Sequence, residues 1–104
     1  MPEEILNAAG VKNRCARFAA PPAGTYAVWF DDYEVMGPDH APGMLQQHDC
    51  SIELYEECID DAAERAIEDQ LNSRGLMWSK IGRVWIASEQ LYQVVYEFSY
   101  LEKM

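Results

Sequence analysis

The chain has 104 residues, of which 49% are hydrophobic and 25% charged, and its formal net charge at pH 7 is −10. This length suits a single domain, residues 1–104, and the composition is that of a globular chain rather than a disordered one. No apolar run approaches the roughly 20 residues that span a bilayer, the start lacks the features of a secretory signal, and three irregularly spaced cysteines suit reduced thiols.

The first 24 residues predict a helix, an extended segment and a break. Pro2 suits the first turn of a helix, the two glutamates after it favour the positive N-terminal end, and Gly10 can end it. We therefore expect a helix over residues 2–9. The basic segment 11–18 is expected to be extended, and the Pro-Pro-Ala-Gly run at 21–24 breaks the chain.

Two strands are expected next. Aromatic and β-branched residues fill residues 25–35, and large apolar groups on both faces indicate a strand that is central in the sheet or covered on both sides. Glycines and prolines over residues 36–43 predict a loop. Residues 48–55 alternate between apolar and polar, which predicts a half-buried strand with Ile52 and Leu54 on its inner face.

An amphipathic helix is expected over residues 60–74. Asp60 or Asp61 can cap its N-terminus, and Gly75 stands where a helix C-terminal residue of left-handed conformation belongs. Glu64 is expected to face solvent together with the acidic residues of the next turn. The apolar stripe that would pack on a sheet consists of Ile59, Ala63, Ala66, Ile67 and Leu71.

Two further strands complete the chain, over residues 80–87 and 91–101, and the three residues between them predict an antiparallel hairpin. Large side chains line one face of the second strand: Tyr92, Val94, Tyr96, Phe98 and Tyr100. The element order is helix, short strand, two strands, helix, two strands. The fold class is therefore α+β, with a mostly antiparallel sheet, an N-terminal helix and the 60–74 helix packed on that sheet.

Sequence motifs for catalysis or cofactor binding are absent: the chain has no phosphate-binding glycine loop, CxxC, HExxH or GxSxG. His48 and Cys50 would point the same way on a strand, but nothing supplies an oxyanion hole or a third orienting group. The acidic and histidine residues of segment 31–49 match no metal-ligand spacing. We expect neither an enzyme nor a metal or cofactor site.

Negative charge is concentrated in the middle of the chain. From Asp31 to Asp69 there are 13 acidic residues and one base, Arg65, whereas the rest of the chain holds 5 acids and 7 bases. This layout disfavours specific binding of nucleic acid through its phosphates. It suits an acidic face that meets a basic face on a neighbour, or a surface that repels DNA.

Several segments together carry a resemblance to a known family. They are P-P-A-G-T-Y-A-V-W at 21–29, the acidic segment 31–48, C-S-I-E-L-Y-E-E at 50–57, the amphipathic helix and the closing strand L-Y-Q-V-V-Y-E-F-S-Y at 91–100. In their order and residue character, over nearly the whole chain, they resemble the small tail-completion and tail-terminator proteins of long-tailed phages and prophages. The pieces I-E-L-Y and Y-E-F-S-Y are the most specific, and none is a catalytic fingerprint.

The resemblance implies a structural protein of a virion, assembled in the cytoplasm of a bacterial host. Such a protein forms a ring, commonly a hexamer, at the head-proximal end of the tail tube, stops tube polymerisation and joins the tail to the head connector. Its partners would be copies of itself, the tail tube protein and the head-connector protein. DNA would pass through the lumen without specific binding, and no membrane is involved. The roles of tail terminator and head–tail joining protein both fit the sequence.

A ring needs a heterologous contact, in which one patch meets a different patch on the next copy. We expect the acidic stretch 31–69 to supply part of one such patch. The other patch is expected to carry the basic residues Lys12, Arg14, Arg17, Lys80 and Arg83. An alternative is an acidic, phage-encoded inhibitor or DNA mimic that binds a basic host protein as a stable monomer. The candidate subunit-interface residues are Arg14, Arg17, Asp31, Asp32, Glu34, Lys80 and Arg83.

Overall fold

The computed structural model describes residues 1–36 and 45–103. Within these ranges the elements are α1 (Pro2–Ala8), β1 (Lys12–Cys15), β2 (Tyr26–Met36), β3 (Leu45–Glu56), α2 (Asp61–Ser73), β4 (Trp78–Ile86) and β5 (Leu91–Lys103). The strands form one sheet in the order β1-β2-β3-β5-β4. β1 runs parallel to β2, and the other neighbours are antiparallel. This is the expected α+β class; the loop predicted at 36–43 falls outside the described residues, except for Met36, which ends β2.

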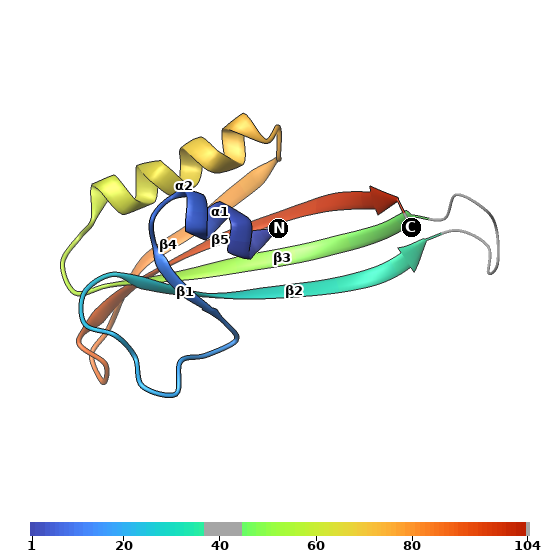
Figure 1. Cartoon of the computed structure of the whole chain (residues 1–104). Helices are drawn as coiled ribbons and strands as arrows, with labels where there is room; N and C mark the ends of the chain where they lie inside the picture. The colour runs from blue at the N-terminus through green and yellow to red at the C-terminus, as the bar shows by residue number, and fades with distance from the viewer. Residues whose placement is uncertain (37–44, 104) are drawn as a thin grey trace.

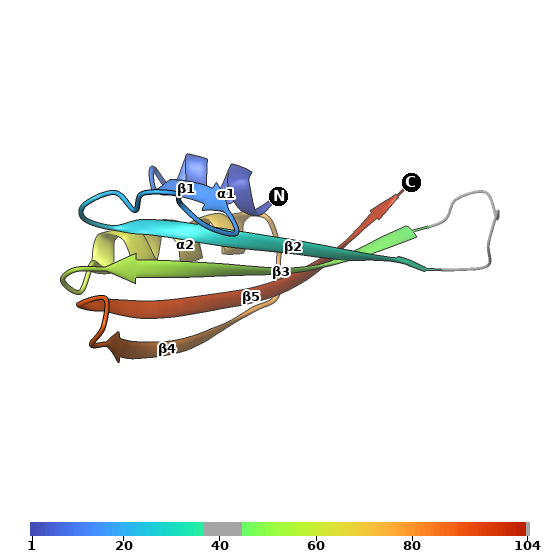
Figure 2. The same cartoon turned by 90° about the horizontal axis from the view of Figure 1, so that it is seen from below.

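Both helices lie on the same side of the sheet, which we call the helix face; the other side is the open face (Figures 1 and 2). They cover only part of its length. β1 pairs with β2 no further than Trp29, and β4 begins opposite Phe98. Beyond Trp29 the sheet continues without β1, and beyond Phe98 it continues without β4. We call residues 30–36, 45–51 and 97–103 of β2, β3 and β5 the arm; β4 borders it only at Glu97 and Phe98. The molecule is accordingly elongated, 49 × 28 × 21 Å, and no helix in the described ranges is long and apolar enough to cross a bilayer.

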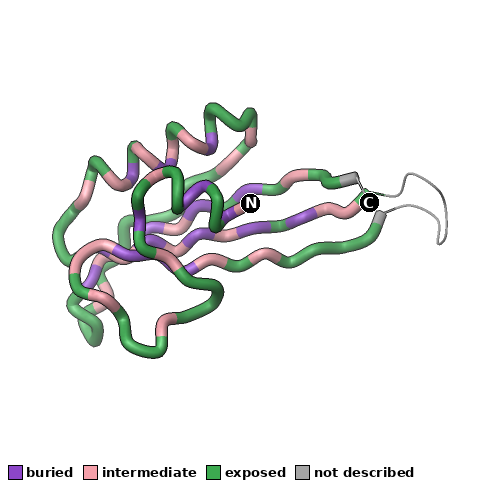
Figure 3. Tube along the Cα trace, viewed as in Figure 1, coloured by how far each residue is buried: buried purple, intermediate pink, exposed green. Residues whose placement is uncertain are grey.

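The core lies between the helices and the sheet. Alternate residues of β3 and β5 point to the helix face, as the sequence pattern predicted, and they contact Ile67 and Leu71 of α2. Burying side chains of this size contributes about 1.5–3 kcal/mol each. Ile59, predicted to belong to the stripe of α2, precedes the helix and is exposed. Figure 3 shows the buried positions gathered beneath the helices and mostly exposed positions along the arm. The largest buried apolar side chains are Ile5, Leu6, Ile52, Leu54, Ile67, Leu71, Val94 and Tyr96.

On the open face, one end of β2 is also covered. The ring of Phe18 packs edge-on against Tyr26 with centroids 5.4 Å apart, and Tyr55 stacks on Tyr26 at 5.3 Å. Tyr26 and Val28 are buried, but Phe30, at the start of the arm, is 36% exposed. β2 is an interior strand of the sheet, as one of the two expectations had it, and it is covered on both sides only at its first residues.

Both ends of α2 are held by specific contacts. Asp60, rather than Asp61, is the N-cap: its Oδ1 accepts a hydrogen bond from the Ala63 amide at 3.0 Å, and its Oδ2 accepts one from Thr25 Oγ1 at 2.7 Å. At the other end Gly75 adopts a φ of +69°, a left-handed conformation that glycine adopts without steric cost.

We expect Asp60→Ala to lower the free energy of unfolding by about 1–2 kcal/mol, because it removes the cap and the hydrogen bond from Thr25, just before β2. Asp61→Ala is the matched control, since it removes an exposed first-turn carboxylate and should cost only about 0.3–0.5 kcal/mol. Urea denaturation followed by circular dichroism measures both. Equal losses in the two variants would contradict the assignment of Asp60 as the cap.

Candidate functional site

A network of charged side chains lies between α2 and the sheet. Arg83 Nη2 donates to both carboxylate oxygens of Glu64, at 2.7 and 2.6 Å, and Lys80 Nζ lies 2.8 Å from Glu64 Oε1 and from Glu68 Oε2. Tyr96 donates its hydroxyl hydrogen to Glu68 Oε2 at 2.7 Å. Glu64 is only 3% exposed, so the expectation that it faces solvent is wrong. A buried carboxylate needs charged or hydrogen-bonding partners, and β4 supplies them.

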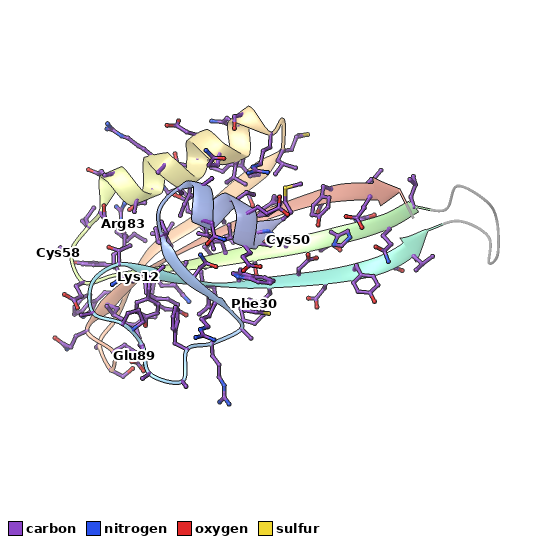
Figure 4. All side chains as sticks on the ribbon, in the orientation of Figure 1. Lys12, Phe30, Cys50, Cys58, Arg83 and Glu89 are labelled. Atoms are coloured by element: carbon purple, nitrogen blue, oxygen red, sulfur yellow. The ribbon has the colours of Figure 1, made fainter. Side chains whose placement is uncertain are left out.

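The position of Arg83 depends on a β-bulge in β4. The pairing of Ile81 with Val95 is followed by that of Val84 with Gln93, so β4 holds one residue more than β5 at this point. Gly82 has a φ of +118°, and a Cβ there would lie 2.8 Å from the carbonyl oxygen of Gln93. The bulge interrupts the strand's alternation and lets Arg83 reach the helix face beneath α2 (Figure 4).

Glu56 completes the network. Its side chain is fully buried, its Oε2 accepts from the Asp60 amide at 2.9 Å, and its Oε1 lies 3.7 Å from Arg83 Nε. Burial, with the Glu64 carboxyl beside it, raises the pKa of Glu56 to about 7. Burial alone would also raise the pKa of Glu64, but hydrogen bonds from Arg83 and Lys80 outweigh it and lower the pKa. One buried carboxyl is thus poised to hold a proton while its neighbour stays ionised.

The helix face of the arm carries a second buried polar group. His48 Nδ1 lies 2.7 Å from Asp31 Oδ1, and the imidazole stacks on the Tyr100 ring with centroids 4.5 Å apart. Burial and the neighbouring Asp31 carboxylate raise the pKa of Cys50 to about 12. A protonated thiol is a poor nucleophile, and the histidine is bonded to the aspartate instead of to the thiol. These side chains therefore pack against one another on the helix face of the arm, and His48 and Cys50 do not form a nucleophile pair.

In the described ranges, no group of three or more His, Cys, Asp or Glu side chains is arranged to hold a metal ion. Asp39 and His40, considered above among possible ligands, fall outside those ranges. Cys15, Cys50 and Cys58 are free thiols.

The open face divides into two bands along the strands. Near the β4–β5 hairpin it is apolar, and Ile81 and Val84 are 51% and 53% exposed. Along the arm it is acidic: Asp32 stands directly opposite Asp49, and Glu97 stands opposite Ser51. A broad open groove in this acidic band is lined by Asp32, Asp49, Ser51, Glu97 and Ser99 of the arm and by Met77 and Ser79 beside the start of β4. Like charges directly opposite each other destabilise a strand pair unless a partner neutralises them.

Basic residues gather at the edge of the sheet formed by β1 and the loop after it. Asn13 points to the helix face, where it donates to Asn7 of α1, so Lys12 and Arg14 point to the open face. Arg17 follows in the loop, and all three basic side chains are exposed. None of them takes part in an ion pair with another described residue.

The structure thus sorts the predicted interface residues into two groups. Lys80 and Arg83 have their charges paired within the chain, and Asp31 is held by His48 at 2.7 Å. The remaining candidates, Arg14, Arg17, Asp32 and Glu34, are exposed on β1, its loop and β2. Lys12 was expected on the basic patch, and Asp49 lies within the acidic stretch expected on the other patch. The sequence did not indicate that Glu97 belongs to the acidic surface, because its place beside Asp49 depends on the register of the strands.

Comparison with protein-family models finds no match, and comparison with curated proteins finds none either. Among solved structures, this chain is similar to a chain of "Virion of native gene transfer agent (GTA) particle", with a TM-score of 0.62 at 15% sequence identity. The match covers 96% of this chain and 84% of the other. At this identity the likeness establishes a shared fold.

We expect Arg83→Met to lower the urea midpoint clearly, because it leaves the Glu64 and Glu56 carboxyls buried without their guanidinium partner. Arg14→Met, the matched control on the open face, should change the free energy of unfolding by less than about 0.5 kcal/mol. If both variants unfold at the wild-type urea concentration, Arg83 has no structural role.

We expect the free energy of unfolding to fall as the pH rises from 4.5, the ordinary pKa of the Glu56 side chain, to about 7, its pKa in the folded protein. The folded state binds this proton more tightly than the unfolded chain does, so raising the pH favours unfolding. The effect should be on the order of 1–2 kcal/mol after allowance for solvent screening. The lowered pKa of Glu64 acts in the opposite sense and below pH 4.5, so the two contributions separate.

Urea titrations at a series of pH values measure this slope. Glu56→Gln should flatten it between pH 4.5 and about 7, whereas Glu89→Gln, an exposed control in the β4–β5 turn, should leave it unchanged. A slope that persists in Glu56→Gln would assign the titration to another group.

Proposed function

We propose that this protein is a structural protein of a virion, a tail terminator or tail-completion protein. In this proposal it forms a ring at the head-proximal end of the tail tube and joins the tail to the head connector. The observation that carries the proposal is the fold, which matches a chain of a gene transfer agent virion over 96% of the present chain. The resemblance of the sequence segments to tail-completion proteins supports the same role independently of the structure.

The surface of the subunit also supports assembly. The helices leave one face of the sheet uncovered, and the apolar side chains of Phe30, Ile81 and Val84 stand exposed on it. Apolar groups gathered on a face with a polar rim are typical of protein contact surfaces. Basic and acidic residues occupy different parts of the subunit, which suits a heterologous contact that closes into a ring.

The proposed partners follow from this role. They are further copies of the chain, commonly six in a ring, the tail tube protein and the head-connector protein. DNA would pass through the lumen without specific binding, since negative charge on its wall repels the phosphates. The protein would act in the virion after assembly in the cytoplasm of the bacterial host.

The first test is the mass of the purified protein by size exclusion with light scattering, at several salt and protein concentrations, followed by electron microscopy of any large species. We expect rings with a central hole. A stable monomer that captures a basic host protein would instead support the inhibitor alternative.

Deletion of the gene in the phage that encodes it separates the two roles within the proposal. Loss of a terminator should give tubes that grow beyond their normal length, because nothing stops polymerisation. Loss of a joining protein should give tails of normal length beside filled, tailless heads. Intact particles in normal yield would overturn the proposal.

A further inference from the structure

We propose that the acidic groove of the arm binds the basic edge of a second copy of this chain. The acidic groove is the part of the open face lined by Asp32, Asp49 and Glu97, and the basic edge comprises Lys12, Arg14 and Arg17. The inference rests on the proposed function, because it names the contact by which copies would assemble.

The acidic groove has no cationic partner among the side chains that the structure describes. Among the described ion pairs, none involves Asp32, Asp49 or Glu97, although Asp49 Oδ1 accepts hydrogen bonds from Ser99 Oγ at 2.8 Å and from Gln47 Nε2 at 3.3 Å. Asp32 and Asp49 are directly paired across β2 and β3. A cation from outside the subunit would relieve their repulsion, and the exposed Met77 at the rim of the groove adds apolar surface to such a contact.

The basic edge is the matching surface on the same chain. Two further bases of the sheet, Lys80 and Arg83, are already paired with Glu64 within the subunit. Lys12 and Arg14 point to the open face from the outermost strand, and Arg17 extends from the loop that follows it. Their positive charge lies away from the arm, along the part of β2 beneath the helices, so each copy presents both halves of the contact (Figures 2 and 4).

Because the two surfaces differ, one copy can bind a second copy through its groove and a third through its edge. Such a contact propagates from subunit to subunit and closes into a ring where the rotation allows it. Electrostatic pairing of this kind sets the register of the subunits and is weakened by salt.

A charge exchange tests the contact. Variant R14E/R17E makes the edge acidic, and variant D32K/D49K makes the groove basic; each alone places like charges in the contact. We expect each variant to self-associate at least about tenfold more weakly than the wild-type chain at low salt, measured by sedimentation velocity. A 1:1 mixture of the two variants, and the chain that combines all four substitutions, should regain assembly because opposite charges face each other again.

Two controls keep this result specific. Circular dichroism and urea midpoints establish that each variant is folded, since the four changed residues are exposed. R65E reverses an exposed base on α2, outside the proposed contact, and should assemble like the wild-type chain.

The outcomes distinguish this inference from the proposed function. Wild-type rings that R14E/R17E and D32K/D49K do not weaken would overturn the contact and leave the ring role standing. Rescue by charge exchange in a species that stops at two copies would establish the contact and overturn the ring. A wild-type chain that stays monomeric at concentrations up to about 1 mM would overturn the contact, and the gene deletion then tests the ring role separately.

Discussion

An α-helix advances about 1.5 Å per residue and a β-strand about 3.3 Å. A helix therefore covers only about half of a strand that has the same number of residues. In this protein α2 has 13 residues and β3 has 12, which corresponds to about 20 Å of helix over about 40 Å of strand. α1, with 7 residues, lies beside α2 and adds little length. The arm therefore extends beyond the helices, which gives the molecule its elongated shape. Because both helices lie on one side of the sheet, most of the open face is uncovered as well, and the exposed apolar groups and the acidic groove lie there.

The layer beneath α2 is held together by charge as well as by apolar packing. Arg83 and Lys80 of β4 contact the helix through Glu64 and Glu68, and Thr25, just before β2, contacts its N-cap Asp60. Buried ion pairs contribute little net stability, because desolvation offsets most of the attraction. They do make other placements costly, since a helix shifted along the sheet would leave several of these charges buried and unpaired. We interpret the network as a device that orients α2 across the sheet.

The class, the order of the elements and most of the core were predictable from the sequence. Period-two alternation in β3 and β5 and the helical stripe of α2 are local patterns, and local patterns identify elements and their inner faces. The prediction that Glu64 faces solvent was wrong, and no local sequence pattern could have corrected it. A helical pattern assigns a charged residue to solvent, and only the bulge at Gly82 brings Arg83 to the inner side of the sheet to receive it.

The candidate site was predictable only in part, for a related reason. Sequence composition separates acidic from basic segments, but it does not show which charges meet within the chain. The pairing of Asp31 with His48 and of Lys80 with Glu64 depends on strand register and on the crossing of α2. The acidic groove needs three strands side by side, with Asp32, Asp49 and Glu97 drawn from segments as far apart as 65 residues in the sequence.

Side chains along β3 alternate between the core and the open face, so the register of this strand decides which side chains the open face carries. Cys50 and Ile52 point into the core, whereas Asp49, Ser51 and Glu53, which alternate with them, face outward. A slip of one residue in the pairing would exchange the two sets, placing carboxylates against the helices and apolar groups in water. One register thus fixes both sets of side chains. A chain that pairs its strands so as to bury Cys50 and Ile52 also places Asp49 and Glu53 on the open face. Substitutions at these outward positions of β3 can therefore change which partner the surface binds, while the buried positions that specify the fold stay the same.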